Sequence, residues 1–301
     1  MAKRIPAVLI GAGSIAEKVY APLLAGSTDF DLLAILSKDG RSAAQLAERY
    51  HIGYGGQSWL KATSQCQVAF VVSSTSSHAS VIRKAITEGM HVYSEKPLVD
   101  DLRTARELVQ LAIQKQKQLF VAFNRRTAPL YVLAKQQLLG QELTTLVIEK
   151  PMAVALGTSL STLLYDDVIH LVDLMMMYLG EPNDYQVRYE AFHQSLTLSV
   201  KVGNSLGLLR YGPMYGGQER LSISTSTASL QVLDMTELQY RSALGDRIVT
   251  ADKWQPTWEK RGFSGAVRAF ATLLAGPITA PSLASHMLID SMRLSFDLTN
   301  L

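Results

Sequence analysis

The sequence has little cysteine, no long apolar run and little excess of charge of either sign. Cys66 is the single cysteine among 301 residues, which excludes an intramolecular disulfide and gives no support to a secreted disulfide scaffold. We therefore expect a cytoplasmic protein. The most apolar stretch, residues 171–179, contains Asp173 and falls far short of the about 20 residues needed to cross a bilayer, so no membrane span is expected.

The charge and the composition are typical of a compact globular protein. The net charge is +3, and the basic residues are scattered instead of gathered with aromatics on one segment, so no nucleic-acid partner is expected. With 48% hydrophobic and 18% charged residues, a chain of 301 residues can bury a core in each of two domains.

The first part of the chain alternates apolar runs with helical patterns, which predicts βαβ units. The runs are nearly continuous, so these strands should be covered on both faces, as in a doubly wound parallel sheet. The predicted strands are residues 5–10, 32–36, 68–72, 91–94 and 119–123. A helix is predicted over 101–117, with Asp100 or Asp101 as its N-cap.

The pattern changes after residue 123, where strands follow one another with few helices between them. In 196–202 apolar and polar residues alternate, which is typical of an antiparallel strand with one buried face. The other predicted strands are 143–149, 186–192, 206–211, 220–225 and 230–233, and the predicted helices are 129–139, 161–179, 264–274 and 282–298. We therefore expect an α/β chain with two domains. Residues 1–123 form the doubly wound domain, and residues 124–301 form an α+β domain on an open, largely antiparallel sheet. The last helix could pack back on the first domain.

A glycine-rich turn follows the first predicted strand. Gly11 permits a tight turn, Gly13 leaves room for a pyrophosphate, and the small Ala16 allows close packing of helix on strand. An ordinary glycine turn is the alternative. The position between a strand and a helix, at the start of a βαβ series, favours a dinucleotide site in a Rossmann domain.

Polar residues at two other places are candidates for catalysis. Lys96 follows the fourth predicted strand, at the edge of the sheet where doubly wound folds bind ligands, although it could be a solvated lysine. Asp166 and His170 lie four residues apart and share one face of an otherwise apolar helix. A packed histidine with a local hydrogen bond is the alternative. No metal site is expected, because this pair has no further histidine or cysteine beside it.

Taken together, these motifs resemble the Gfo/Idh/MocA oxidoreductase family, and within it the MviM-like branch. The segments that carry the resemblance are 11–16, 73–78, 95–97, 123–126, 166–173 and 260–263. The resemblance implies that Lys96, Asp166 and His170 are the catalytic residues. It also implies that the dinucleotide lies along Gly11, Gly13, Ser14, Ile15, Ser73, Ser74, His78, Glu95 and Lys96. Ser73 and Ser74 stand where many relatives have Thr-Pro.

The end of the second predicted strand bears on the choice of cofactor. NAD enzymes usually carry an acidic residue there, whereas a 2′-phosphate calls for hydroxyl and basic groups. Ser37 and Lys38 occupy this turn, Asp39 lies two positions beyond the usual acidic site, and Arg41 follows. We therefore expect a preference for NADP over NAD.

The resulting hypothesis is an NAD(P)-dependent oxidoreductase acting on the CH–OH group of a small, carbohydrate-like molecule such as a sugar or polyol. In this hypothesis His170 moves the hydroxyl proton, Lys96 stabilises the alkoxide and Asp166 orients its partners. A non-catalytic protein that senses the dinucleotide is the alternative. We also expect a homodimer or homotetramer formed through the open sheet.

Overall fold

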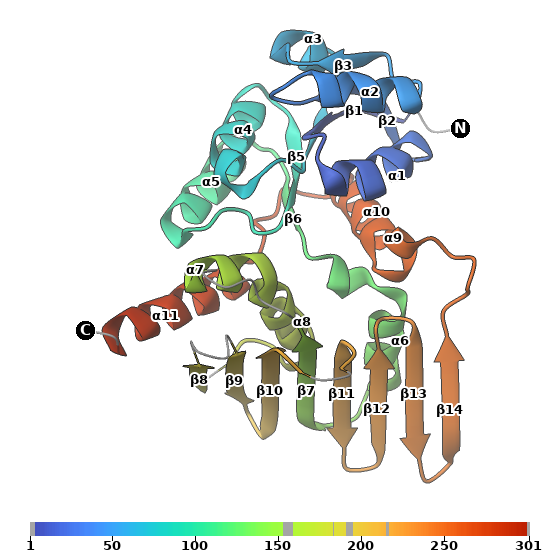
Figure 1. The fold of residues 1–301 in the computed structure, drawn as a ribbon, viewed down its shortest axis with the longest axis vertical. Coiled ribbons are helices and arrows are strands. Elements are labelled where there is room, and N and C mark those ends of the chain that lie inside the picture. The colour runs from blue at the N-terminus through green and yellow to red at the C-terminus, as the bar shows by residue number, and fades with distance from the viewer. Residues whose placement is uncertain (1–3, 153–158, 183, 191–194, 215–216, 300–301) are drawn as a thin grey trace. The chain divides into compact units, whose positions relative to one another are not determined.

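The computed structural model describes residues 4–152, 159–182, 184–190, 195–214 and 217–299 (Figure 1). The chain forms two compact units, one of residues 1–123 with 266–283 and the other of residues 124–265 with 284–301. Residues 266–283 thus group with the first unit, although the sequence analysis assigned them to the second domain. Each unit is described by itself below.

The first unit contains the predicted doubly wound sheet. Its six strands are all parallel and lie in the order β3-β2-β1-β4-β5-β6. This order places a topological switch between β1 and β4, the position where such sheets bind ligands. The strands are β1 (Ile5–Ile10), β2 (Phe30–Leu36), β3 (Tyr54–Gly56), β4 (Val68–Val71), β5 (His91–Glu95) and β6 (Leu119–Ala122). Strand β3 was not predicted, because three residues that include two glycines carry no apolar pattern.

Helices cover both faces of this sheet, and this explains the continuous apolar strands. They are η1 (Ala16–Tyr20), α1 (Ala21–Ala25), α2 (Arg41–Arg49), α3 (Trp59–Thr63), α4 (Thr75–Thr87), α5 (Leu102–Gln114) and α10 (Phe263–Leu274). The carboxylate of Asp101 caps α5 by accepting from the Thr104 amide at 2.7 Å, as predicted. Phe270 of α10 is fully buried, and its ring stacks on Phe30 with centroids 6.0 Å apart.

The second unit is built on a mixed sheet of eight strands in the order β14-β13-β12-β11-β7-β10-β9-β8. Among the described strand pairs, only β7 and β10 run parallel, so the sheet is largely antiparallel, as predicted. The strands are β7 (Leu143–Pro151), β8 (Asp184–Glu190), β9 (Ser195–Val202), β10 (Ser205–Gly212), β11 (Arg220–Thr225), β12 (Ala228–Leu233), β13 (Glu237–Ser242) and β14 (Gly245–Thr250). Residues 191 and 192 of the predicted strand 186–192 lie outside the described residues. Strands β13 and β14 were not predicted. All residues of β14 are exposed and leave no buried face to recognise, whereas β13 alternates Leu238 and Tyr240 with polar residues and was overlooked.

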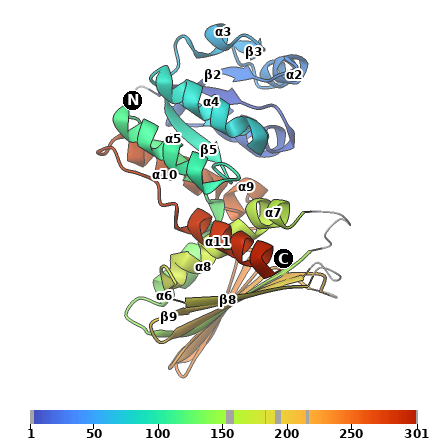
Figure 2. The same ribbon diagram turned by 90° about the vertical axis from the view of Figure 1, so that its left-hand side faces the viewer.

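Helices pack on one face of this second sheet (Figure 2). The helices of this unit are η2 (Asn124–Thr127), α6 (Pro129–Gln137), α7 (Leu160–Leu163), η3 (Leu164–Val168), α8 (Ile169–Leu179), α9 (Thr257–Lys260) and α11 (Ala284–Thr299). Of these, α6 packs on β12 and β13 and α8 packs on β7 and β10, whereas α11 packs on α8 and α9 packs on α6. The predicted helix 161–179 is therefore interrupted by the π-helical turn η3. Gly207 lets α8 approach β10, since a Cβ there would lie 2.7 Å from Leu179 Cδ1.

The strand residues on the other face of the second sheet are mostly polar. Thr197 and Lys201 are exposed, whereas Leu196, Leu198 and Val200 between and beside them are buried. Arg210 pairs with Glu149 on this polar face at 2.9 Å. The apolar alternation in β9 is therefore explained by the helices, which cover the face that Leu196, Leu198 and Val200 occupy. Among the described helices, none is long and apolar enough to cross a membrane.

Candidate active site

A cavity of about 920 Å³ opens in the first unit where β1, β2 and β4 end. It lies at the topological switch between β1 and β4, where the doubly wound fold is expected to bind a nucleotide. The predicted cofactor-binding residues on its wall are Gly11, Gly13, Ser14, Ile15, Ser37, Lys38, Ser73 and Ser74. The wall also includes Ser77 of the segment 73–78, and Gln57, Trp59 and Val81, for which no role was predicted from the sequence.

The two glycines of the turn after β1 have different structural roles. Gly11 has a φ of +116°, and a Cβ there would lie 2.7 Å from the Ser73 amide nitrogen, so a side chain is excluded by the protein itself. A Cβ on Gly13 would meet no atom within 4 Å and would project into open space at the cavity wall. Gly11 therefore shapes the turn, whereas Gly13 keeps space free for a ligand. This geometry fits a dinucleotide pyrophosphate at the start of the following helix.

The turn after β2 contains a small hydrogen-bonded cluster around Asp39. The Ser42 hydroxyl donates to Asp39 Oδ2 at 2.6 Å, and the Ser37 hydroxyl donates to Oδ1 at 2.7 Å. These two bonds lower the pKa of the exposed Asp39 carboxyl. Ser37, Lys38 and Asp39 all line the cavity, whereas Arg41 is exposed at the start of α2 and lies outside the lining.

His78 lies outside the cavity lining and is buried between two loops. Its Nδ1 is 3.0 Å from the carbonyl oxygen of Pro97, and its Nε2 is 3.0 Å from that of Ser73. Burial lowers the pKa of His78, against the raising effect of these carbonyl groups. The ring thus ties the loop after β4, which lines the cavity, to the loop that follows Lys96.

Glu95 and Lys96 lie at the end of β5, also outside the lining. Glu95 is buried and accepts a short hydrogen bond from the Tyr20 hydroxyl of η1, and its Oε2 accepts from the Lys96 amide at 3.0 Å. Burial raises the pKa of Glu95, against the lowering effect of Tyr20 and Lys96. Glu95 therefore anchors the backbone of Lys96 to the helix that follows the glycine turn, while the Lys96 side chain is half-buried.

The other two predicted catalytic residues belong to the second unit. Asp166 is exposed on η3, and His170 is half-buried in the first turn of α8. Asp173, one turn further on, is buried in a separate contact, where it accepts from Arg126 at 2.7 and 2.9 Å. Within the part of the chain that the structure describes, no cluster of three or more metal-ligating side chains occurs.

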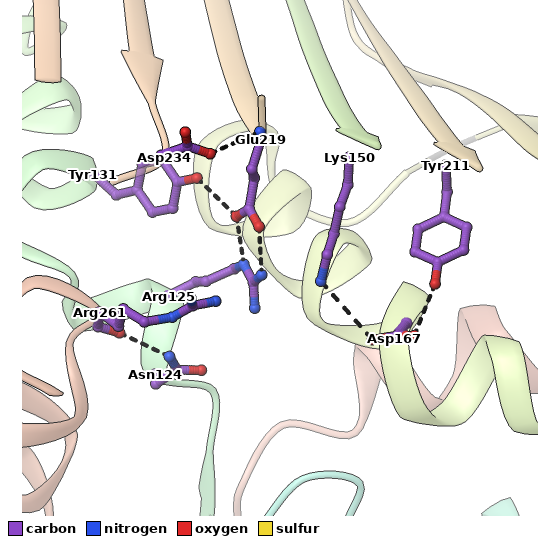
Figure 3. Close-up of polar contacts among 9 residues, drawn as sticks. All are labelled: Asn124, Arg125, Tyr131, Lys150, Asp167, Tyr211, Glu219, Asp234 and Arg261. Carbon is purple, nitrogen blue, oxygen red and sulfur yellow. Dashed lines mark hydrogen bonds and ion pairs between the residues drawn. The ribbon is translucent and has the colours of Figure 1, made fainter. Parts of the chain in front are cut away.

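A buried ion pair in the second unit was not predicted from the sequence (Figure 3). Arg125 of η2 donates to both oxygens of Glu219, at 3.0 and 2.8 Å, and the Tyr131 hydroxyl donates to Oε1 at 3.1 Å. The side chains of Arg125 and Glu219 are only 3% and 10% exposed. Burial alone would raise the pKa of Glu219, but the charge and hydrogen bonds of Arg125, together with the charges of Lys150 and Arg261, outweigh burial and lower the pKa to about 2.

A second polar group lies beside this ion pair. Lys150 of β7 and Tyr211 of β10 are register partners on the parallel strand pair, and both point toward Asp167 of η3 (Figure 3). The Tyr211 hydroxyl donates to Asp167 Oδ2 at 2.8 Å, while Lys150 Nζ lies 3.8 Å from Oδ1. Asp167 directly follows Asp166, so this polar row adjoins one of the predicted catalytic residues within the same unit.

The structure also brings together two segments that the sequence analysis noted without assigning a role. The Asn124 side-chain amide donates to the Arg261 carbonyl at 2.7 Å, and the Thr127 hydroxyl donates to the Gly262 carbonyl at 2.7 Å. Gly262 has a φ of +85°, and a Cβ there would lie 2.1 Å from the Asn124 carbonyl oxygen. Only glycine allows this approach, which holds the backbone of Arg261 against the segment that carries Arg125.

Comparisons with known proteins agree with a nucleotide-binding fold in the first unit. A sequence model of the oxidoreductase family with an NAD-binding Rossmann fold matches residues 5–123. The YceM protein of Salmonella typhimurium is 32% identical over 303 residues, which cover 95% of this chain and 94% of YceM. Inositol 2-dehydrogenase of Rhizobium meliloti is 25% identical over 228 residues, which cover 73% of this chain and 64% of that enzyme.

Solved structures share the fold. The dehydrogenase MviM of Clostridium difficile matches with a TM-score of 0.88 at 22% identity, over 97% of this chain and 100% of MviM. A Gfo/Idh/MocA family oxidoreductase from Vibrio cholerae matches with a TM-score of 0.87 at 23% identity, over 98% of this chain and 99% of the Vibrio chain. These structural matches establish the fold, and the sequence of YceM is similar over nearly the full length of both chains. The chain belongs to the Gfo/Idh/MocA family of NAD-binding oxidoreductases.

Proposed function

We propose that this oxidoreductase transfers a hydride between a nicotinamide cofactor and a carbon that bears a hydroxyl or carbonyl group, on a sugar, a polyol or a related small molecule. The observation that supports the proposal most directly is the cavity at the end of β1, with open space at Gly13 beside the N-terminal end of a helix. When bound there, the dinucleotide supplies or accepts the hydride. A cytoplasmic location is part of the proposal, on the ground of the single cysteine.

In this proposal the chain holds the substrate oxygen and moves its proton. His170 takes the hydroxyl proton during oxidation and returns it during reduction, because histidine exchanges protons near neutral pH. Lys96 donates a hydrogen bond to the developing alkoxide. Asp166 orients His170 or a neighbouring hydroxyl. Glu95 and His78 act as positioning residues, since they fix the loop on both sides of Lys96.

We further propose that NADP(H) is preferred over NAD(H). Lys38 lies on the cavity wall at the end of β2, where a 2′-phosphate on the adenosine ribose would be placed. Asp39 lies on the same wall and opposes an anion, but its carboxylate oxygens already accept from Ser37 and Ser42. Arg41 is exposed nearby and adds positive charge at the start of α2.

Turnover assays test the proposed function. The absorbance of the nicotinamide band is followed while sugars, inositols and small carbonyl compounds are offered to the full-length protein with either cofactor. We expect substrate-dependent oxidation or reduction of the cofactor with at least one polyhydroxylated compound. The kinship with an inositol 2-dehydrogenase makes inositols the first compounds to offer. Tight cofactor binding with no turnover across the whole panel would instead favour a dinucleotide sensor.

A further inference from the structure

Trp59 is the only aromatic side chain among the described residues that line the cavity of the first unit, and the proposed function gives it no role. It is half-buried in the first turn of α3. Val81 of α4 lines the same cavity and adds apolar surface, whereas Lys38 and Ser42 on the wall are polar. A nucleotide needs both kinds of surface, because its phosphates and hydroxyl groups bind polar groups while its base stacks on aromatic rings.

Two residues of α4 hold the indole ring of Trp59 in place. Its Nε1 donates a short hydrogen bond to Glu88 Oε2, and the Lys84 ammonium group lies over the ring, 4.4 Å from its centroid. Lys84 and Glu88 lie outside the cavity lining. The indole N–H group is therefore already bonded and Lys84 covers one face of the ring, so the ring offers the cavity an apolar aromatic surface.

The backbone that carries Trp59 is fixed as well. The Ser58 amide donates to the Tyr54 hydroxyl of β3 at 3.0 Å, and the Ser58 hydroxyl accepts from the Lys61 amide and so caps α3. Gly56 leaves room for the Tyr54 hydroxyl, since a Cβ on Gly56 would lie 2.5 Å from it. An aromatic surface that is already rigid loses little conformational freedom when a ligand packs on it, which favours binding.

We propose that the adenine base of the nicotinamide dinucleotide stacks on the surface of Trp59 that lines the cavity, beside Val81. The inference rests on the proposed function, because it needs the dinucleotide in this cavity. It adds a side chain that holds the adenine half of the cofactor. Trp59 contributes equally to the binding of NAD and NADP, since the two cofactors carry the same base, whereas Lys38 acts only on the 2′-phosphate.

Tryptophan fluorescence tests the stacking without requiring turnover. The double variant Trp254→Phe/Trp258→Phe leaves Trp59 as the single tryptophan of the full-length protein. This protein is titrated with ADP-ribose, which carries adenine but no nicotinamide, and with nicotinamide mononucleotide, which carries nicotinamide but no adenine. We expect ADP-ribose to quench the Trp59 emission saturably and nicotinamide mononucleotide to leave it unchanged. Trp59 stays in place here, so the experiment tests the inference even if variants at this position fold poorly.

Calorimetric titration of variants measures what the stacking contributes to affinity. Trp59→Leu should weaken the binding of NAD⁺, NADP⁺ and ADP-ribose by the same factor, about tenfold to a hundredfold, the usual effect of losing one stack of a base on an aromatic ring. Trp59→Phe removes the hydrogen bond to Glu88 but keeps an aromatic face, so affinity should stay within about threefold of wild type. The matched control is Trp254→Leu, at a residue of the second unit that is 93% exposed, and it should leave all three affinities unchanged.

The outcomes separate this inference from the proposed function. Dinucleotide binding that is unchanged in Trp59→Leu, or ADP-ribose binding that leaves the Trp59 emission unchanged, overturns the stacking and leaves the oxidoreductase intact. Equal losses of affinity in Trp59→Leu and Trp59→Phe also overturn it, because the aromatic face would then make no difference. Binding that depends on the aromatic ring, in a protein that oxidises or reduces no cofactor, supports the stacking and counts against the proposed reaction. Absence of binding by NAD⁺, NADP⁺ and ADP-ribose overturns both.

Discussion

Replacing Glu219 with glutamine should strongly destabilise the second unit. Glutamine keeps the size of the side chain but leaves the Arg125 guanidinium, only 3% exposed, without its counter-charge. Breaking a buried ion pair by removing one partner typically costs about 3–5 kcal/mol. The structure gives a similar figure, because lowering the pKa of Glu219 from 4.5 to about 2 corresponds to about 3 kcal/mol at 1.36 kcal/mol per tenfold change in proton affinity.

The sign of the pH dependence follows from the same pKa. Glu219 binds its proton less readily in the folded protein than in the unfolded chain, so its contribution is fully present above pH 4.5. The contribution is lost as the pH falls from 4.5 toward about 2. The difference in unfolding free energy between wild type and Glu219→Gln should therefore be about 3 kcal/mol at neutral pH and shrink steadily in acid.

Urea unfolding followed by circular dichroism measures this difference. With a slope of about 3 kcal/mol per molar urea, the midpoint should fall by about 1 M at neutral pH. The control is Asp246→Asn, which breaks an exposed ion pair of the same unit and should cost less than about 1 kcal/mol. Equal effects of the two substitutions, or a Glu219 effect that stays constant down to the acid limit, would refute the argument from the buried pair.

Three further predictions concern the cofactor and the assembly. Gly13→Val should weaken dinucleotide binding at least tenfold and leave the urea midpoint unchanged, whereas Gly11→Ala should lower the urea midpoint. The reason is that, of these two positions, a Cβ meets the backbone only at Gly11. Fluorescence titration with the dinucleotide and urea unfolding of both variants check this. Lys38→Ala should weaken NADPH binding by about tenfold to a hundredfold and leave NADH binding unchanged at equal ionic strength, and tighter binding of NADH by the wild type would remove the proposed preference. The chain should scatter light as a homodimer or homotetramer at micromolar concentration, and a monomer alone would contradict the expected association through the open sheet.

The sequence was sufficient to predict the fold class of both units for a physical reason. Strands buried on both faces need continuous apolar residues, and the five predicted strands of the first sheet have them. In the second sheet, the alternation in β9 was recognisable because one face packs on helices while the other stays polar. β3 and β14 lack both patterns: the first is short and rich in glycine, and the second is exposed throughout.

The candidate site was predictable only where its residues are close in sequence. The glycine turn occupies a few consecutive positions after a strand, so a dinucleotide site could be proposed there from spacing, whereas the role of Lys96 was implied by the family resemblance and stays a prediction. Arg125 and Glu219 are 94 positions apart, and Lys150 meets Tyr211 only through the register of β7 and β10. A single sequence carries no record of that register. The segments 123–126 and 260–263 were recognised in the sequence, but their contact through Asn124 and Gly262 could not be inferred without the structure.

The structure also bears on the surface through which the expected homo-oligomer would form. Association was expected through the open face of the second sheet. In the structure the apolar residues of β9 face the helices, and the other face carries Thr197, Lys201 and the Arg210–Glu149 pair. Leu206 and Leu208 of β10 lie on the same face as Lys201, so an interface there would combine apolar contacts with hydrogen bonds and ion pairs.

The proposed function assigns Lys96 and His170 a direct role in hydride transfer to or from a nicotinamide cofactor. Its most direct test is the rate of change of nicotinamide absorbance, measured with the best substrate found, in wild type, Lys96→Met and His170→Asn. The control is His51→Asn, at an exposed position with a φ of 55°, which asparagine tolerates. We predict that kcat/KM falls by about a hundredfold or more in the first two variants, while their affinity for the cofactor changes far less. Full activity in both Lys96→Met and His170→Asn would contradict the account.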